Sequence, residues 1–365
     1  MTALPAKLPR GSGAPLGLSR LTVLVSVGFA LCLLVLLVVP LLGGGVDLRL
    51  ALAAPPFGPY DSPDALVFWG TRVPRVLLGL LVGGSLAVSG LAFQAVLRNP
   101  LADPYVLGVS SGAALGKALA MLWPVSGSLA IVLWTPMWCF VGALVPLLLL
   151  YGFAASGRRF SAMSLLLAGV MVNVSLSAVI LLIQYFADFT KVRQMQLWWM
   201  GALDVIGYGR LAGTAPLAVL AVMVIWLHAR AMNLLSLDSC TAAHLGVDVR
   251  RTVNLLVWAA SVLTATVVAV SGPIGFVGLI VPHALRLMFN ADNRLLVPLS
   301  MTYGGAFLVL CDTVGWRGLQ FARWLGAPVA FSAEIPVGVV TALVGGPLFL
   351  FLLFRTMRAQ AAACD

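Results

Sequence analysis

The sequence has very little charge for its length. Asp, Glu, Lys and Arg make up only 9% of its 365 residues, hydrophobic residues make up 61%, and Glu334 is the one glutamate. A soluble globular domain carries about 25% charged residues. The composition therefore excludes a soluble fold and predicts an integral membrane protein.

Cysteine and histidine are too few and too scattered to indicate a metal site. The five cysteines are odd in number and show no CxxC spacing: Cys32, Cys139, Cys240, Cys311 and Cys364. This pattern indicates neither a disulfide framework nor a zinc site. His283, one of three histidines, has no second ligand beside it in the sequence. We expect no bound metal and no cofactor.

Motifs for ATP hydrolysis and for catalysis within a membrane are also absent. Residues 111–118 read SGAALGKA, which resembles the end of a phosphate-binding loop. Ser111 replaces the required first glycine and Ala118 replaces the final Ser or Thr, so the motif fails. No HExxH motif occurs. We therefore expect that the chain is not an enzyme and that any ATPase is a separate partner.

The chain contains ten apolar runs that can each cross a bilayer. They fall near 21–42, 66–97, 105–123, 129–155, 161–186, 211–229, 252–271, 273–289, 296–315 and 335–354. We expect an all-α polytopic membrane protein of about ten transmembrane helices, with both termini on one side. Residues 1–20 are interpreted as a cytoplasmic tail and 21–365 as one transmembrane domain, because the first run is longer than a signal-peptide core.

Basic residues predict the orientation of the chain. With the N-terminus in the cytoplasm, thirteen Lys and Arg residues fall inside, eight fall outside and Lys117 lies within a span, which accounts for all 22. The eight outer residues are Arg49, Arg72, Arg75, Lys191, Arg193, Arg210, Arg317 and Arg323. This bias also explains the net charge of +10 without any nucleic-acid partner.

The stretch from Thr71 to Gly116 carries the most specific pattern. It reads TRVPRVLLGLLVGGSLAVSGLAFQAVLRNPLADPYVLGVSSGAALG. Prolines at 100 and 104 end one span before the next begins. Small residues such as Gly79 and Gly83 permit close helix packing in lipid.

This stretch closely resembles the signature of the FecCD-type permeases, the membrane subunits of bacterial ABC importers for ferric siderophores, haem and cobalamin. A second stretch, AVSGPIGFVGLIVPHALR at 269–286, resembles the other family signature. The resemblance covers most of the chain and implies a multi-pass protein of the bacterial inner membrane. Its implied partners are two ABC ATPase subunits, a periplasmic substrate-binding protein, a second copy of the chain and the lipid bilayer.

The tetrapeptide Ala-Val-Ser-Gly occurs at 87–90 and again at 269–272. In the expected topology these two helices run in opposite directions. The repetition hints at an inverted internal repeat, which is typical of transporters built around a central path.

The longest cytoplasmic segment, 229–251, reads ARAMNLLSLDSCTAAHLGVDVRR. Its apolar residues predict an amphipathic helix that stops at Gly246, and Asp238 is a candidate cap for a short helix. The resemblance implies that this segment docks on the ATPase, through Leu237, Asp238, Ser239, Cys240, Thr241, Ala242, Leu245 and Gly246. The alternative is an amphipathic helix lying on the membrane.

The resemblance also implies a cytoplasmic gate near Ala162 and Met163 and a pathway that includes Met171. The alternative at the gate is an ordinary helix start capped by Ser161. Residues 187–210 contain WWMGAL, which resembles the short outer helix of the family beside the mouth of the pathway.

Outer arginines are the candidate docking residues for the binding protein. Arg72 and Arg75 are expected at the mouth of the second span, and Arg317 and Arg323 in the loop before the last one. In the resembled family such arginines pair with glutamates of the binding protein, and a planar guanidinium suits this pairing. The alternative is lipid headgroup binding.

Two acidic residues are expected at span ends. Asp312 would end one span, and Glu334 would precede the helix of the last span, where an acid is favoured by the helix dipole. An ion-coupled secondary transporter should instead carry ionisable residues at midspan. The sequence therefore favours a permease subunit of an ABC importer, with haem or another iron complex as the first candidate cargo and cobalamin as the second.

Overall fold

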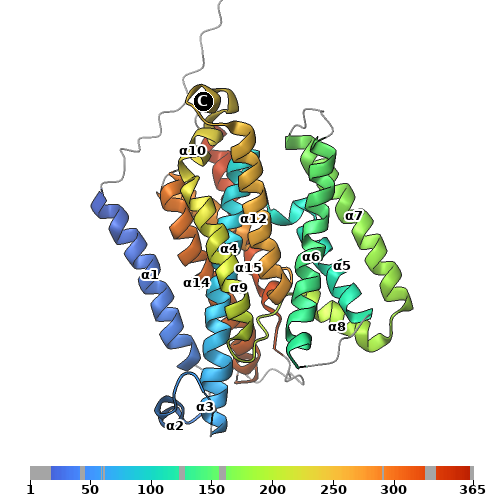
Figure 1. Cartoon of the computed structure of the whole chain (residues 1–365). Helices are drawn as coiled ribbons and strands as arrows, with labels where there is room; N and C mark the ends of the chain where they lie inside the picture. Colours follow the sequence, from blue (N-terminus) through green and yellow to red (C-terminus); the bar gives the residue numbers. More distant parts are fainter. Residues whose placement is uncertain are drawn as a thin grey trace, which may run out of the picture.

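A computed structural model describes residues 18–41, 46–58, 60, 62–122, 128–155, 162–289, 292–324 and 334–361. All regular structure in these residues is helical (Figure 1). The elements are α1 Leu18–Leu41, α2 Leu48–Ala53, α3 Pro63–Val67, the π-helical turn η1 Phe68–Arg72, α4 Val73–Leu97, the 3-10 turn η2 Pro104–Leu107, α5 Val109–Leu122, α6 Ser128–Ala155, α7 Ala162–Phe186, α8 Phe189–Trp199, α9 Gly209–Leu227, α10 Ala229–Leu237, α11 Ser239–His244, α12 Val249–Ser271, α13 Val277–Phe289, α14 Asn293–Trp324 and α15 Val337–Ala361. The predicted fold class is confirmed.

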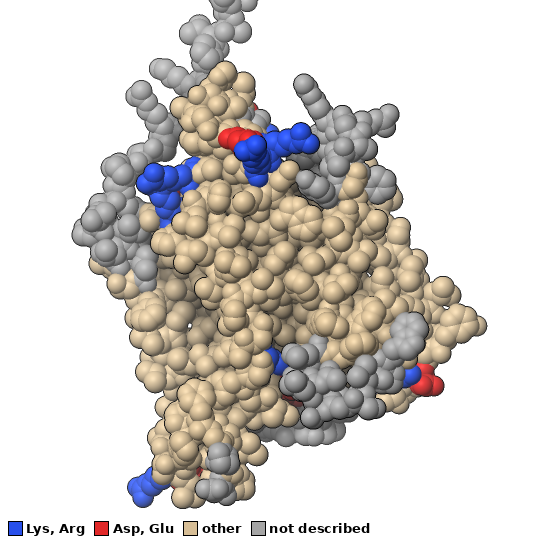
Figure 2. Space-filling view, viewed as in Figure 1, with Lys and Arg blue, Asp and Glu red and all other residues tan. Residues whose placement is uncertain are grey.

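Each of the ten predicted apolar runs contains an apolar helix. Five helices are long and apolar enough to cross a membrane, and five shorter apolar helices match the remaining runs. In Figure 2 the charged side chains of the visible face lie toward the two ends of the molecule, with an uncharged band between them. This arrangement fits a chain that is surrounded by hydrocarbon at its middle.

Two of the predicted spans are shorter than the sequence indicated. α5 has 14 residues and α13 has 13, so each is about 20 Å long, against about 30 Å for the hydrocarbon core. The predicted run at 105–123 begins with a 3-10 turn and with Gly108, whose φ of 87° ends that turn before α5 starts. The run at 273–289 begins with non-helical backbone, in which Phe276 has a φ of 71°.

The helix α4 lies at the centre of the bundle and is buried along most of its length. The helices packed around it approach closely because glycines remove side chains from the contacts. A Cβ on Gly83 would meet the carbonyl oxygen of Gly304 in α14, and a Cβ on Gly90 would meet that of Gly278 in α13. The helices α4 and α14 therefore form a closely packed pair.

Proline sets the local structure where α4 begins. Pro74 has no N–H and cannot bond the carbonyl of Gly70 four residues earlier. The backbone N–H of Gly207, in the connection before α9, donates to that carbonyl at 2.7 Å instead. The connection after α8 is thereby attached to the central helix.

The repeated tetrapeptide lies on two antiparallel helices, as the expected topology required. Arg98, at the end of α4, pairs with Asp238, which precedes α11 and α12. Gly79, near the start of α4, lies beside Leu203, and the N–H of the neighbouring Ala202 donates to the carbonyl of Ser271 at the end of α12 at 2.8 Å. Ser89 of the first copy donates to the carbonyl of Ala260 in α12 at 2.8 Å. Each long helix is followed by a break and a short helix, α5 after α4 and α13 after α12.

Both described termini lie at one end of the bundle. In Figure 1, α1 begins and α15 ends near α10 and α11, whereas α2, α3 and α8 lie at the opposite end. We call these the α10–α11 end and the α2–α8 end.

Candidate functional site

The predicted coupling segment forms two short helices at the α10–α11 end. Asp238 separates them, with its carboxylate accepting from the backbone N–H groups of Cys240 at 3.0 Å and Thr241 at 3.2 Å. Gly246, with φ of 85°, follows the end of α11, and the N–H of Val247 bonds the carbonyl of Ala242. The predicted cap and the predicted helix stop are both confirmed.

The expectation of one amphipathic helix for this segment is wrong, because the extended backbone of Asp238 divides it into α10 and α11. Met232 and Leu235 are buried and hold α10 on the bundle, whereas Leu237 and Leu245 are 72% and 61% exposed. Cys240, Thr241 and Gly246 are also exposed. Ala242 is fully buried, so its side chain packs against this chain and cannot touch a partner. The side chain of Ser239 lies outside the described part of the structure.

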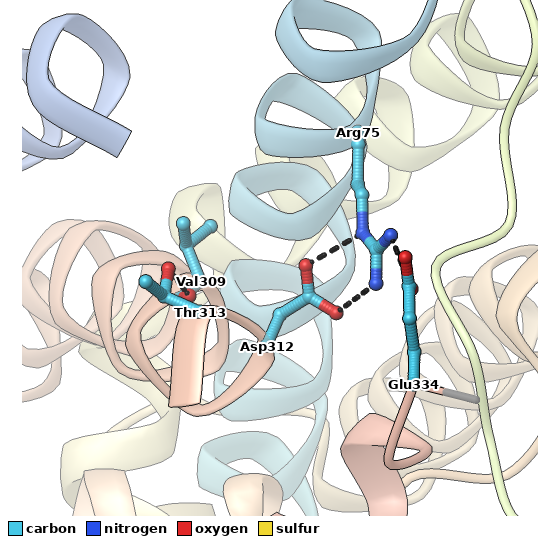
Figure 3. A network of polar contacts seen from close by, with 5 residues as sticks. All are labelled: Arg75, Val309, Asp312, Thr313 and Glu334. Carbon is cyan, nitrogen blue, oxygen red and sulfur yellow. Dashed lines mark hydrogen bonds and ion pairs between the residues drawn. The ribbon is translucent and has the colours of Figure 1, made fainter. Parts of the chain in front are cut away.

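At the α2–α8 end, Arg75 joins two carboxylates from distant parts of the chain (Figure 3). Its Nε and Nη2 lie 2.8 and 2.9 Å from the two carboxylate oxygens of Asp312 in α14. Its Nη1 lies 2.7 Å from Oε2 of Glu334, three residues before α15. A charge-assisted pair with two parallel bonds is among the stronger polar contacts in proteins. The three side chains thus connect α4, α14 and the start of α15.

This arrangement corrects the expected position of Asp312. The residue does not end a span, because α14 continues to Trp324. An acid this far inside a helix of the bundle is stable because Arg75 satisfies both of its oxygens. Sequence reasoning named Arg75, Asp312 and Glu334 separately, but no local signal joins residues 237 positions apart.

The other docking candidates also differ from the expectation. Arg317 and Arg323 lie in α14 and not in a loop, since the helix extends past its apolar part. Arg72 is 8% exposed, donates from Nη1 to the carbonyl of Pro40 at 3.1 Å, and lies 5.5 Å from the ring of Trp316. Arg317 is partly exposed, and its guanidinium lies 5.5 Å from the centroid of the same Trp316 ring, which gives a second cation–π contact. The side chain of Arg323 lies outside the described part of the structure.

A hollow of about 560 Å³ opens on the side of the bundle between α5, α8 and α15. Its walls include Tyr105, Ser110, Trp199, Met200 and Leu343. Tyr105 is held in place because its hydroxyl donates to the carbonyl of Ile274 at 3.1 Å and accepts from the N–H of the same residue at 3.0 Å. The hollow is mainly apolar and contains no charged wall residue among these positions.

The predicted gate residues Ala162 and Met163 lie in the first turn of α7, and their side chains are outside the described part of the structure, as is Ser161. Met171 on the same helix is 60% exposed. The apolar face of α7 has few neighbours, since Val174 and Leu181 are 62% and 65% exposed. In a soluble protein this face would be a liability, whereas here lipid or a further helix can cover it.

Comparison with known proteins decides which family this arrangement belongs to. The model of the FecCD transport family matches residues 30–355. The chain belongs to the FecCD transport family. It is 42% identical over 327 residues to the cobalamin import system permease protein BtuC of Halobacterium salinarum, covering 88% of this chain and 83% of the relative.

Another FecCD relative is the hemin transport system permease protein HmuU of Yersinia pestis. It is 38% identical over 332 residues, covering 90% of this chain and 96% of that protein. The fold also matches an inward-facing structure of a protein described as a metal-chelate type ABC transporter, with a TM-score of 0.75 and 31% identity over 90% of this chain and 99% of the other. The chain is therefore a multi-pass permease of the FecCD type, and ATP is hydrolysed by a separate subunit.

The structure also shows where the remaining polar candidates of this FecCD permease lie. Residues 111–118, which resemble a phosphate-binding loop, lie within helix α5. His283 in α13 is 8% exposed, and no group of three His, Cys, Asp or Glu side chains occurs among the described residues. Lys117 is partly buried in α5 and packs near Cys139.

Proposed function

We propose that this FecCD permease is the membrane subunit of a binding-protein-dependent ABC importer for an iron complex, either haem or a ferric siderophore. Two copies of the chain enclose the translocation path, and two separate ATPase subunits drive it. The observation that carries the proposal is the similarity to a hemin permease along 90% of the chain. The chain itself performs no covalent chemistry, and its helices move relative to one another.

The α10–α11 end is proposed to face the cytoplasm and to bind the ATPase. Leu237 and Leu245 project from it with most of their surface exposed, although apolar residues on a water-exposed loop are unfavourable without a partner. Cys240, Thr241 and Gly246 extend the same surface. Both termini then lie in the cytoplasm of a bacterial cell, in agreement with the excess of basic residues predicted on that side.

The α2–α8 end is proposed to face the periplasm and to dock the substrate-binding protein. Arg317 supports this role best, because its guanidinium lies at the partly exposed end of α14. Arg72 and Arg75 are proposed for the same surface, although both have partners within the chain. A glutamate of the binding protein would have to compete with Glu334, which is the more exposed of the two carboxylates at Arg75.

The path is proposed to run between two copies of the chain, past the hollow beside α15 and past α7. Met171 and the wall residue Met200 present polarizable thioethers, and Trp199 presents an aromatic face. Such a surface holds a large apolar chelate weakly and without a fixed hydrogen-bond pattern, which permits release. The gate of this path is proposed near Ala162 and Met163.

Cobalamin is the second candidate cargo. The relative with 42% identity is a cobalamin permease, and it covers nearly as much of the chain as the hemin permease does. The lining of the hollow is mainly apolar and carries no charged residue that would favour one of the two cargoes over the other.

Reconstitution of the complete importer in proteoliposomes tests the proposal. Haem, a ferric hydroxamate siderophore and cyanocobalamin are supplied in turn with the cognate binding protein, and ATP hydrolysis and uptake are measured. We expect an iron complex to stimulate both. Stimulation by cyanocobalamin alone would establish the second candidate, and uptake without ATP would contradict the importer class.

A further inference from the structure

The coupling segment is attached to the bundle through a side chain that is not among the predicted docking residues. Asn233 lies in the middle of α10, between the buried residues Met232 and Leu235 on either side. Its Nδ2 donates to Oδ1 of Asp292 at 2.8 Å, and its Oδ1 accepts from the backbone N–H of Asn293 at 2.8 Å. Both partners lie at the start of α14.

The first of the α14 backbone N–H groups is capped by Asn233, and the second hydrogen bond of Asn233 holds Asp292, which caps the next one. The first N–H groups of a helix have no acceptor within the helix. Asp292 accepts from the N–H of Arg294 at 3.0 Å, and Asn233 accepts from the N–H of Asn293, which is fully buried. The amide of Asn233 therefore acts as part of the cap of a helix to which it does not belong.

A second contact fixes the same turn of α14. Pro298 has no N–H, so the carbonyl of Arg294 four residues earlier lacks its partner within the helix. The indole N–H of Trp226, in the last turn of α9, donates to this carbonyl at 3.2 Å. The segment that leads into α10 and α10 itself are thus both bonded to the first turn of α14.

From this turn, α14 reaches the opposite end of the bundle. It has 32 residues, which at about 1.5 Å per residue is roughly 48 Å. It packs on α4 through glycines and carries Asp312, which pairs with Arg75 and, through it, with Glu334 before α15. A movement of α10 therefore has a bonded route to the α2–α8 end that does not pass through α12, the helix that follows α11 in the chain.

We infer that Asn233 is a positioning residue through which movement of the α10–α11 segment is transmitted to α14, and from α14 to the surface at the α2–α8 end. This inference rests on the proposed function, in which the ATPase binds α10–α11 and the binding protein docks at the other end. Coupling between two distant sites needs a packed element that both of them influence. In this chain α14 meets that requirement.

A polarity swap provides the test. In Asn233→Asp, two carboxylates face each other and the donor to Asp292 is lost, while the acceptor for Asn293 remains. In the double variant N233D/D292N, the amide of position 292 donates to the carboxylate of position 233 after a small rotation, so the contact is restored. Asp292→Asn alone keeps an acceptor for the Asn233 amide. The matched control is Asp248→Asn, another exposed cap, which accepts from the N–H of Arg251 at 3.0 Å at the start of α12.

The full importer in proteoliposomes is measured for cargo taken up per ATP hydrolysed and for release of the binding protein on addition of ATP. We expect N233D to lower both by about five-fold or more, which is the range of site-to-site coupling. Both quantities should stay within about two-fold of the wild-type values in the variants that keep the contact, a change smaller than the range of site-to-site coupling. These variants are N233D/D292N, D292N and D248N. ATPase association and thermal stability are measured in parallel. A variant that loses coupling but keeps ATPase association and thermal stability is defective in transmission and not in folding.

Normal uptake per ATP and normal ATP-driven release in N233D would overturn the inference. Failure of the double variant to recover, with assembly and stability intact, would overturn it too. If N233D assembles poorly, Asn233→Ala, which removes both the donor to Asp292 and the acceptor for Asn293, enters the same comparison with D248N. Failure of the proposed function is a different result, because the wild-type importer would then show no ATP-dependent uptake of haem, siderophore or cyanocobalamin.

Discussion

The guanidinium of Arg75 and the carboxylate of Asp312 meet in two parallel contacts, with Nε to Oδ2 at 2.8 Å and Nη2 to Oδ1 at 2.9 Å. The side chains are 20% and 10% exposed, so water screens the pair only in part. The carboxylate of Glu334 binds the remaining edge of the guanidinium. Three segments that are separated in the sequence are held together by this one cation.

Removal of one partner should destabilise the protein strongly. Asp312→Asn leaves Arg75 with one exposed carboxylate, and breaking a buried pair costs about 3 kcal/mol or more. We expect a clear fall of the unfolding temperature in detergent, measured by intrinsic fluorescence. Asp204→Asn, which removes an exposed acid from the pocket that Arg75, Asp312 and Glu334 also line, is the control and should have little effect. Equal unfolding temperatures for the two variants would show that the pair is not important for stability.

Gly90 and Gly213 should respond in opposite ways to the same substitution. A Cβ on Gly90 would collide with the backbone of Gly278, whereas a Cβ on Gly213 in α9 meets no atom within 4 Å. Gly90→Ala should separate α4 from α13 and lower stability by about 2 kcal/mol or more. Gly213→Ala should leave stability unchanged or raise it by up to about 1 kcal/mol, because alanine favours the helix. Guanidinium unfolding in detergent, followed by far-UV circular dichroism, compares the two, and tolerance of Gly90→Ala would contradict the close packing.

Exposed leucines at the α10–α11 end should determine binding of the ATPase. Leu237→Ala with Leu245→Ala removes the two exposed leucine side chains of that surface. We expect at least about a ten-fold loss of affinity, since a few apolar anchors dominate most interfaces. Co-purification and light scattering measure the assembly. The control is Leu50→Ala with Leu52→Ala on α2, whose side chains are 55% and 57% exposed at the other end. Normal assembly of the first variant would place the ATPase elsewhere.

Arg317 should contribute to docking of the binding protein without affecting the ATPase. Arg317→Glu introduces repulsion toward an acidic docking surface, and we expect at least about a ten-fold weaker affinity by surface plasmon resonance. Arg49→Glu, on α2 at the same end, makes the same change of charge at an exposed residue that is not among the proposed docking arginines. The same loss of affinity in both variants would indicate a general charge effect instead of a docking contact. Reversal of Arg75 is a poor test, because a third carboxylate beside Asp312 and Glu334 would disturb the fold itself.

Much of the fold was predictable from the sequence, because a membrane imposes strong local rules. The ten apolar runs correspond to ten apolar helices, and Asp238 and Gly246 form the cap and stop that their residue types indicate. The lengths of α5 and α13 were not predictable, since apolar composition continues through the 3-10 turn and Gly108 before α5 and through the non-helical residues 273–276 before α13. The continuation of α14 to Trp324 was also not predicted. This part of the helix is polar, and a polar stretch after an apolar run resembles a loop.

By itself the sequence determined that this chain spans a membrane as helices and where most of those helices lie. Hydrocarbon offers no hydrogen-bond partners, so each apolar segment must satisfy its own backbone, and that requirement is visible locally. Only the tertiary structure decided which polar groups meet: Arg75 with Asp312 across 237 positions, and Asn233 with Asp292 across 59. These contacts depend on how helices pack in three dimensions, and no period or spacing within one helix carries that information.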